Sequence, residues 1–263
     1  METDFFYLWL EGFAVVLLFM SIIWVWSVRL GNAGIVDPFW GLGFVLVVVF
    51  YALNIPLRHL HQWLVMVLVS LWGLRLFIYL FLRNYGKEED YRYRQFRANY
   101  GIHRYWWVSF FQVFMLQGVL LAFISVTLLG GMYGHSVAPN SALWMVLGVL
   151  LWLIGFLFET VGDYQMAQFK KDPLSKGKVM DKGLWRYTRH PNYFGDTMVW
   201  WGYACFAIYN GLYLTIAGSL VMTFLIVKIS GVAMLEKNLI TRRQGYEEYM
   251  MKTSAFFPWM PKK

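Results

Sequence analysis

Seven apolar runs divide the chain, and each is bounded by polar, charged or glycine-containing segments. They cover residues 5–28, 35–53, 62–82, 106–129, 142–162, 193–208 and 212–235. Several of them reach the roughly 20 residues that a helix needs to cross the hydrocarbon core of a bilayer. The pattern predicts an all-α, polytopic transmembrane bundle of about seven helices, in which residues 1–263 form a single integral-membrane domain. Asp37 is the expected N-cap of the second helix, with Pro38 in its first turn.

Basic residues are concentrated in the polar segments between these runs. Residues 83–104 and 163–189 are predicted to be basic loops, and the polar tail after Glu236 ends in Lys262-Lys263. Cytoplasmic loops of membrane proteins carry an excess of Lys and Arg. With seven spans, this rule places the C-terminus in the cytoplasm and the N-terminus outside.

The composition agrees with a membrane protein. Hydrophobic residues make up 59% of the chain and charged residues 14%, whereas a soluble domain is about a quarter charged. The net charge of +8 is explained by membrane topology, so no nucleic-acid partner is expected. Cys205 is the single cysteine, which excludes an intrachain disulfide and a cysteine-rich metal framework, and no metal site is predicted.

Ionisable side chains fall within or at the ends of the apolar runs, toward the predicted cytoplasmic side. These residues are Asp37, Arg75, Glu159, Asp163, Asp196, Lys228 and Glu236. Charges at this depth face the interior of a bundle or a water-filled cavity rather than lipid. We therefore predict a polar intramembrane cavity that opens to the cytoplasm. Interhelical salt bridges that only hold the bundle together are the alternative.

Helical spacing groups several of these side chains. Arg75, Tyr79 and Arg83 recur every four residues and share one helix face, as do the pairs Glu159–Asp163 and Asn192–Asp196. Cations at the mouth of the predicted cavity suit a phosphate-bearing ligand, or else the headgroups of inner-leaflet lipids. They include Lys170, Lys171, Arg186, Arg189 and His190. The chain has neither a GxGxxG motif after a strand nor a P-loop, so any dinucleotide site is expected to be of a non-Rossmann type.

The stretch 183–196 contains the motif Arg189-His190-Pro191-Asn192-Tyr193-Phe194-Gly195, and Trp200-Trp201-Gly202-Tyr203 follow it. Together with Asp37-Pro38-Phe39-Trp40-Gly41, the run from Arg75 to Tyr79, Asp163-Tyr164 and the tail Tyr246-Glu247-Glu248-Tyr249, it resembles the membrane steroid 5-alpha-reductase family. The similarity is to the bacterial branch of that family with a domain of unknown function. The resemblance implies a multi-pass protein of the bacterial inner membrane.

The resemblance also implies a function. It suggests NADPH in a cytoplasm-facing cavity and hydride transfer to the β-carbon of an enone in a lipophilic substrate. The implied NADPH contacts are Arg75, Tyr79, Asp163, Tyr187, Asn192 and Asp196, with Lys170 and Lys171 near the phosphates. The charge map adds Arg83, Glu159, Arg189, His190 and Glu236 to the candidate cofactor-binding residues. Trp40, Trp72 and Trp200 are candidates for a flat hydrophobic substrate pocket, although ordinary packing also explains any one of them.

The sequence leaves alternatives open for the proton donor and for the reaction. Family reductases carry a Gln-Glu pair on the second helix and a tyrosine on the third, where this chain has Asp37 nearby and Trp72. Asp37 or Tyr79 is therefore the candidate donor. The motif from Arg189 to Gly195 also resembles isoprenylcysteine and phospholipid methyltransferases, which use S-adenosylmethionine. A non-catalytic lipid-binding membrane protein is a third interpretation.

Overall fold

The computed structural model describes residues 4–134, 141–229, 236, 243 and 245–262. These residues form helices and turns, and none of them lies in a β-strand. Two compact units can be distinguished, one made of Met1–Val137 with Asn210–Gly218 and the other of Ala138–Tyr209 with Ser219–Lys263. We call them the first and the second unit and describe each by itself.

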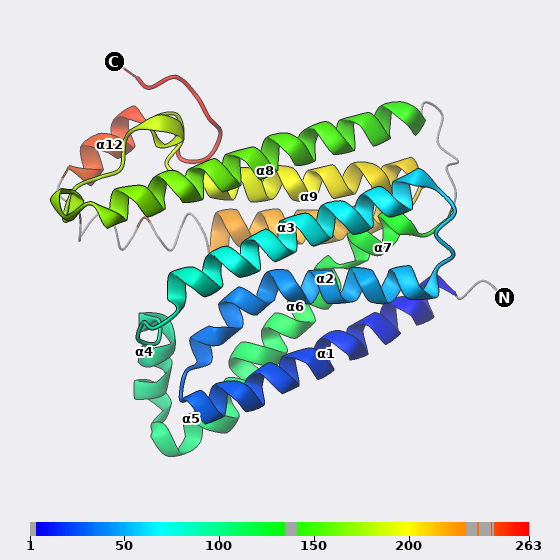
Figure 1. Ribbon diagram of the computed structural model, residues 1–263, viewed down its shortest axis with the longest axis horizontal. Helices are drawn as coiled ribbons and strands as arrows, with labels where there is room; N and C mark the ends of the chain where they lie inside the picture. Colours follow the sequence, from blue (N-terminus) through cyan, green and yellow to red (C-terminus); the bar gives the residue numbers. More distant parts are fainter. Residues whose placement is uncertain (1–3, 135–140, 230–235, 237–242, 244, 263) are drawn as a thin grey trace. The chain divides into compact units, whose positions relative to one another are not determined.

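Helices α1, α2 and α3 form the larger part of the first unit (Figure 1). Its elements are α1 (Phe5–Leu30), a 3₁₀ turn (Ala33–Ile35), α2 (Val36–Asn54), α3 (Leu60–Asn84), α4 (Tyr91–Tyr100), α5 (Ile102–Ser109), a π-helical turn (Phe110–Met115), α6 (Leu116–Ile124), α7 (Val126–Met132) and a 3₁₀ turn (Tyr213–Ile216). Helix α2 packs along α3, and glycines permit the close approach. A methyl group placed on Gly41 would lie 2.6 Å from the carbonyl oxygen of Gly73.

Helices α8 and α9 pack against each other along their length in the second unit. The unit contains α8 (Ser141–Lys171), 3₁₀ turns at Pro173–Ser175 and Gly183–Arg186, α9 (Pro191–Tyr209), a π-helical turn (Leu225–Ile229) and α12 (Tyr246–Lys252). Helix α10 (Ala217–Phe224) begins in the first unit and continues into the second. Small residues at such interfaces allow helix backbones in membranes to come close together.

The glycine-lined interface of α8 and α9 sets which residues face one another. Gly148, Gly155 and Gly162 of α8 recur every seven residues, and the first two oppose Gly202 and Gly195 of α9. A methyl group on Gly155 would lie 2.5 Å from the carbonyl oxygen of Gly195, and one on Gly148 would lie 3.0 Å from that of Gly202. Any side chain here would push the two backbones apart.

Five helical segments are long and apolar enough to cross a membrane: Phe5–Leu30, Ala33–Asn54, Leu60–Asn84, Ile102–Met132 and Ala142–Lys171. They confirm the first five apolar runs. The sixth run is α9, and the seventh begins as a shorter apolar helical segment, Tyr213–Ile229. Residues 230–235 of the seventh run and 237–242 of the tail lie outside the described residues. The total of seven spans and the orientation remain predictions.

Three local predictions were wrong. The segment 83–104 is not only a loop, because α4 and the start of α5 lie in it. Helix α8 continues through Asp163 to Lys171, so the second basic loop begins after that residue. Asp37 is not an N-cap, since the preceding 3₁₀ turn runs directly into α2 and places its carboxylate within the first helical turn.

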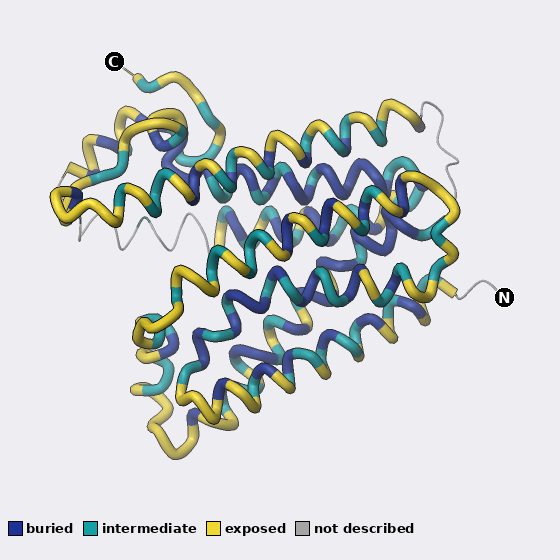
Figure 2. Tube along the Cα trace, viewed as in Figure 1, coloured by how far each residue is buried: buried dark blue, intermediate teal, exposed yellow. Residues whose placement is uncertain are grey.

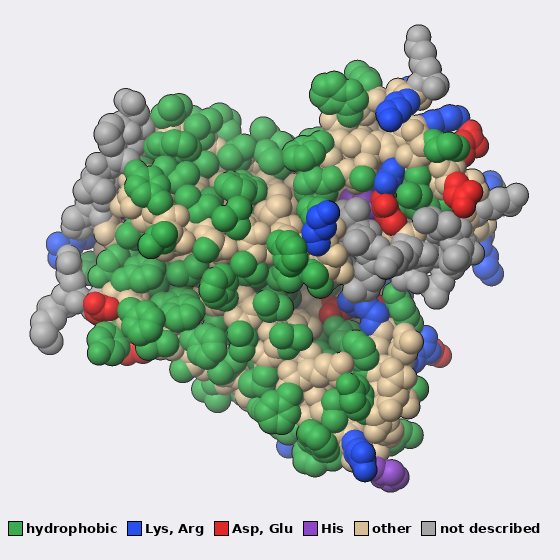
Figure 3. Space-filling model, turned by 180° about the vertical axis from the view of Figure 1, so that it is seen from behind, with side chains coloured by type: hydrophobic (Ala, Val, Ile, Leu, Met, Phe, Trp, Pro, Cys, Tyr) green, Lys and Arg blue, Asp and Glu red, His purple; other side chains and the backbone are tan. Residues whose placement is uncertain are grey.

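The outer surfaces of the long helices are apolar, as expected for contact with lipid. Figure 2 shows exposed and buried residues alternating along α1 and α8, and hydrophobic side chains dominate the face in Figure 3. On α8 the exposed apolar residues recur every three or four positions, among them Leu143, Val146, Leu150, Ile154 and Leu157. In water such a continuous patch is unusual for a monomeric protein.

Candidate functional site

Four polar side chains lie on the facing helices α8 and α9: Glu159 and Asp163 on α8, and Asn192 and Asp196 on α9. We call these four residues the acid–amide cluster. Glu159 and Asp163 are buried, with 4% and 6% of their surface exposed. The Asn192 side-chain amide donates to the Asp163 carboxylate at 3.4 Å. The predicted pairs Glu159–Asp163 and Asn192–Asp196 are therefore on facing helices of one unit.

The glycine-lined interface brings these groups together. The Gly195 Cα lies so close to α8 that a methyl group there would be 2.5 Å from the backbone nitrogen of Glu159. One on Gly162 would be 3.3 Å from the backbone nitrogen of Asn192. Each acidic residue of α8 thus lies next to a close-contact point with α9, which positions it toward the residues of the motif.

Asn192 has unused hydrogen-bonding capacity. Its Oδ1 atom is buried and has no hydrogen-bond partner among the residues that the structure describes. A buried carbonyl oxygen left in this state costs free energy unless a ligand or water donates to it. The cluster therefore offers a carbonyl acceptor beside carboxylates, a combination that suits ligands rich in hydroxyl and amide donors.

Arg189, His190 and Glu236 form a buried ionic group next to this cluster in sequence. The Arg189 guanidinium donates from Nε to Glu236 Oε1 at 2.8 Å, and Nη2 of Arg189 lies 2.8 Å from the same oxygen. His190 Nε2 is 3.1 Å from that oxygen. The three predicted cofactor-binding residues therefore contact one another, which agrees with the salt-bridge alternative for this part of the charge map.

The remaining donors of Arg189 fix the C-terminal segment. Its Nη1 donates to the carbonyl oxygens of Met250 and Thr253, both at 2.8 Å, and its backbone N–H donates to the carbonyl of Ser254 at 2.9 Å. The Tyr249 hydroxyl donates to the carbonyl of Trp185. The sequence motif is thus held between α8 and the C-terminal segment. The sequence alone did not indicate that Arg189 binds this segment.

The ionic contacts of Glu236 change its acidity. Burial acts to raise the pKa of the Glu236 carboxyl, but hydrogen bonds from His190 and Arg189 outweigh burial and lower the pKa below its usual value. Burial and the nearby negative charge of Glu236 raise the pKa of Tyr246 to about 12. Glu236 is therefore a stable anion at neutral pH.

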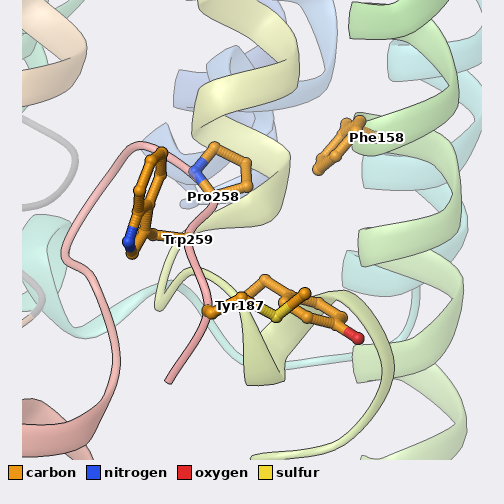
Figure 4. Close-up of a pocket in the computed structure, with 5 residues that line it drawn as sticks. Phe158, Tyr187, Pro258 and Trp259 are labelled. Atoms are coloured by element: carbon orange, nitrogen blue, oxygen red, sulfur yellow. The ribbon is translucent and has the colours of Figure 1, made fainter. Parts of the chain in front are cut away.

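Other candidates of the second unit lie apart from the cluster. Lys170 and Lys171 are exposed in the last turn of α8. Tyr187 lines an apolar pocket with Phe158, Pro258, Trp259 and Met260 (Figure 4). Trp200 is fully buried, where its ring meets that of Tyr203 edge to face at 5.4 Å. Trp200 thus has the environment of a packing residue.

Arg75, Tyr79 and Arg83 share one face of α3 in the first unit, as predicted. The guanidinium carbons of Arg75 and Arg83 lie 5.5 and 5.7 Å from the centre of the Tyr79 ring. Such distances permit cation–π attraction. The tyrosine hydroxyl therefore belongs to a side chain flanked by two positive charges, whereas its contact with a cofactor stays a prediction.

Asp37 is bound by two side chains of α4. Arg92 Nη2 donates to its Oδ2 at 2.8 Å, and the Tyr93 hydroxyl donates to its Oδ1 at 2.6 Å. Both oxygens are thus engaged, which leaves neither directed at a substrate carbonyl in this arrangement. Which of the two candidate donors, Asp37 or Tyr79, supplies a proton stays a prediction.

The tryptophans of the first unit are packing residues in this structure. Trp72 is fully buried, and its ring is 5.8 Å from that of Phe44. The Trp40 ring also contacts Phe44, with the ring centres 5.5 Å apart and the ring planes at 84° to each other. Their role in a substrate pocket stays a prediction.

The α4 segment contains polar residues that the sequence analysis missed. Glu89 accepts the backbone N–H of Ala33 at 2.7 Å and two donors of Arg97 at 2.9 and 3.1 Å. Asp90 caps the helix by accepting the N–H of Arg92. An acidic residue just before a helix-forming stretch is a recognised start signal, so Asp90 was the available indication. Within the described ranges no group of three or more His, Cys, Asp or Glu is arranged to hold a metal ion.

These features define a multi-pass integral membrane protein that is helical throughout its described part. Residues 23–253 match the family model described as "Protein of unknown function (DUF1295)". Since this match covers most of the chain, the protein belongs to that family.

Relatives give a coarse indication of activity. An uncharacterized protein of Schizosaccharomyces pombe is 25% identical over 97% of this chain and 82% of its own length. The 3-oxo-5-alpha-steroid 4-dehydrogenase 1 of Bos taurus is 31% identical over 34% of the chain and 38% of its own length. A protein of Ustilaginoidea virens named "probable O-methyltransferase" is 35% identical over 21% of the chain and 19% of its own length. The last two matches are local, and no solved structure matches the chain.

Proposed function

We propose that this protein is an NADPH-dependent oxidoreductase that reduces a carbon–carbon double bond in a lipophilic enone, steroid-like or otherwise. The acid–amide cluster on α8 and α9 is the observation that carries the proposal. It is a buried polar site in a membrane protein, where such groups are costly and usually functional. The local similarity to a steroid dehydrogenase supports the same class.

The cluster fits the polar groups of NADPH. Carboxylates accept hydrogen bonds from ribose hydroxyls in other dinucleotide sites. The buried Oδ1 of Asn192 is suited to accept from the nicotinamide carboxamide. Phosphates would be repelled by Glu159 and Asp163, so we place them toward the cations Lys170 and Lys171. Eleven residues of α8 separate Glu159 from Lys170, which is about 16 Å along the helix.

The chain's own residues would orient the reaction partners. When bound, NADPH would supply the hydride. Asp163 and Asn192 would hold the ribose and the carboxamide, and the tightly packed interface of α8 and α9 would exclude water. In the first unit, the cations of Arg75 and Arg83 over the Tyr79 ring would stabilise negative charge on its hydroxyl, which supports Tyr79 as a candidate proton donor alongside Asp37.

The enzymatic test uses purified protein in detergent with NADPH and a 3-oxo-4-ene steroid or simpler enones. Consumption of NADPH matched by a product heavier by two hydrogens is the expected result. Asn192→Leu should raise the KM for NADPH about tenfold, the effect of losing roughly 1.4 kcal/mol, whereas Asp181→Asn in the exposed loop should leave it unchanged. A product formed equally well by both variants would contradict the assigned site.

A second candidate, an S-adenosylmethionine-dependent methyltransferase, is favoured by one feature of the same cluster. Glu159, Asp163 and Asp196 provide three carboxyl groups, and carboxylates suit the positive sulfonium of that cofactor better than they suit a phosphate. The local match to a probable O-methyltransferase agrees with this. Transfer of a labelled methyl group to a lipid extract, without NADPH consumption, would establish this function in place of the reductase. If neither cofactor binds, a non-catalytic lipid-binding role remains.

A further inference from the structure

An apolar pocket of about 270 Å³ lies in the second unit, where the C-terminal segment crosses the motif. Figure 4 shows Pro258 and Trp259 on the C-terminal segment, Phe158 on α8, and Tyr187 on the segment that precedes α9. The Trp259 backbone N–H donates to the carbonyl of Tyr187 at 2.9 Å, which fixes the two segments to each other. Met260 completes the lining, so every residue around the pocket presents hydrocarbon or an aromatic ring.

The pocket continues the lipid-facing surface of α8. Phe158 lies on α8 one turn after Ile154 and about one turn before Val161. Ile154 and Val161 are both exposed. Trp259, Met260 and the neighbouring Phe257 are about 70% exposed. Aromatic side chains of this kind gather at the interface between membrane and water. A hydrocarbon chain lying along α8 would therefore reach the pocket without crossing a polar barrier.

Cationic residues lie close in sequence to the residues that line this pocket. Arg186 precedes Tyr187, and its carbonyl accepts from the Thr253 hydroxyl at 3.4 Å. The Lys262 backbone N–H donates to the carbonyl of Lys252 at 2.9 Å. These contacts bring together the three short segments that carry the exposed residues Arg186, Lys252 and Lys262. Among their described contacts, the one acidic partner is Glu248, 2.6 Å from Lys252. This combination of hydrocarbon lining and positive edge matches an anionic phospholipid.

We propose that the pocket binds an acyl chain of an anionic phospholipid from the adjacent membrane leaflet, and that Arg186 and Lys262 contact its phosphate. The volume is near the lower limit of about 300–1,000 Å³ typical of ligand pockets, so it accommodates part of one chain. The mostly apolar lining distinguishes this site from the acid–amide cluster. The inference does not depend on the proposed reductase activity.

Native mass spectrometry of the full-length protein tests this, with titration of dioleoyl phosphatidylglycerol or dioleoyl phosphatidylcholine into the detergent-purified protein. We expect one phosphatidylglycerol to bind with higher affinity than any phosphatidylcholine. Arg186→Gln or Lys262→Gln should each weaken that binding about fivefold, since one basic residue near an anionic lipid surface contributes about that factor. Lys87→Gln, in a basic segment of the first unit, should have no effect.

Filling the pocket provides the second arm. Phe158→Trp enlarges a lining residue, and Leu157→Trp places the same ring on the neighbouring, lipid-facing position as a matched control. Phosphatidylglycerol binding should fall about tenfold in the first variant and stay unchanged in the second. Should Phe158→Trp fail to fold, Met260→Trp fills the pocket from the exposed C-terminal segment.

Three outcomes would overturn the proposal. Equal affinity for both lipids would show that the site does not select an anionic headgroup. Unchanged phosphatidylglycerol binding in a folded, pocket-filling variant would show that the lipid binds elsewhere. Displacement of the lipid by NADPH or by an enone would instead make the pocket part of the active site, and the lipid assignment would be wrong.

Discussion

Arg189 makes polar contacts through both its guanidinium group and its backbone N–H. Its guanidinium contacts Glu236 and two carbonyl oxygens, and only 8% of its side chain is exposed. Sequence analysis predicted Arg189, His190 and Glu236 as cofactor-binding residues. Their mutual contacts show that a motif at a membrane boundary can hold the chain's own C-terminal segment, and they leave cofactor contact by these residues as a prediction.

Arg189→Ala should destabilise the protein strongly, because it removes the guanidinium that donates to the Glu236 carboxylate and to the carbonyls of Met250 and Thr253. Breaking a buried ion pair on one side costs about 3–5 kcal/mol. Arg189→Lys keeps the charge but loses the forked geometry, so an intermediate effect is expected. Thermal unfolding in detergent measures both. Arg94→Ala, which removes an exposed ion pair with Glu88, is the control, and its expected cost is below about 1 kcal/mol. An equal loss of stability in the two alanine variants would contradict this role of Arg189.

Glu236 gives the protein a defined pH dependence. Because contacts with His190 and Arg189 lower the folded-state pKa below the usual value of 4.5, the carboxylate stabilises the folded protein at any pH above that value. This contribution is lost as the pH falls through the lowered pKa. The difference in unfolding midpoint between the wild type and Glu236→Gln should therefore be largest near neutral pH and shrink on acidification. A difference that grew toward acid pH would contradict the predicted lowering of the Glu236 pKa in the folded protein.

At the level of single elements, α4 shows what periodicity could not provide. Its ten residues are too polar to be recognised as part of an apolar run, and they contact partners distant in sequence, such as the Asp37 carboxylate and the Gly31 carbonyl. The apolar runs, in contrast, predicted the long helices to within a few residues, except that α8 extends to Lys171. Its last turns are polar, and no local signal distinguishes a solvated helix end from a loop with the same composition.

Glu89 and Glu88 offer a direct test of α4. Glu89→Ala removes the acceptor for the Ala33 N–H and for two donors of Arg97, so we expect a loss of about 1.5–3 kcal/mol in unfolding free energy. Glu88→Ala removes one exposed partner of Arg94 and should change the unfolding free energy by less than about 1 kcal/mol. Chemical denaturation of both variants gives the comparison, and similar values would mean that α4 is not held by Glu89.

The close packing of α8 and α9 leads to a second prediction about single elements. Gly195→Ala places a methyl group 2.5 Å from two backbone atoms of α8, so the helices must separate. Overpacking of this kind costs about 1–3 kcal/mol, and it should also weaken ligand binding at the acid–amide cluster. Ala142→Val adds volume at an exposed position of α8 and should be neutral in thermal unfolding. A neutral Gly195→Ala would show that the backbones are farther apart than described.

For the whole molecule, the sequence supported the membrane class and the family more strongly than the chemistry. Charged residues at matching depths predicted a shared polar cavity. The structure brings Asp163 and Asn192 into contact, and the cavity itself stays a prediction. The structure also identifies the partners of Asp37, whose catalytic role stays a prediction. A carboxylate near a membrane boundary has the same sequence signature whether it meets a substrate or, as here, Arg92 and Tyr93.

The most direct test of the central claim is thermal unfolding of the detergent-purified protein with NADPH or with S-adenosylmethionine, in the wild type and in Asn192→Leu. A ligand at about 100 times its dissociation constant adds about 2.7 kcal/mol to folded-state stability. We predict that NADPH raises the unfolding midpoint of the wild type, that Asn192→Leu reduces this increase, and that S-adenosylmethionine has no effect. An increase with S-adenosylmethionine alone, or no increase with NADPH, would contradict the reductase assignment.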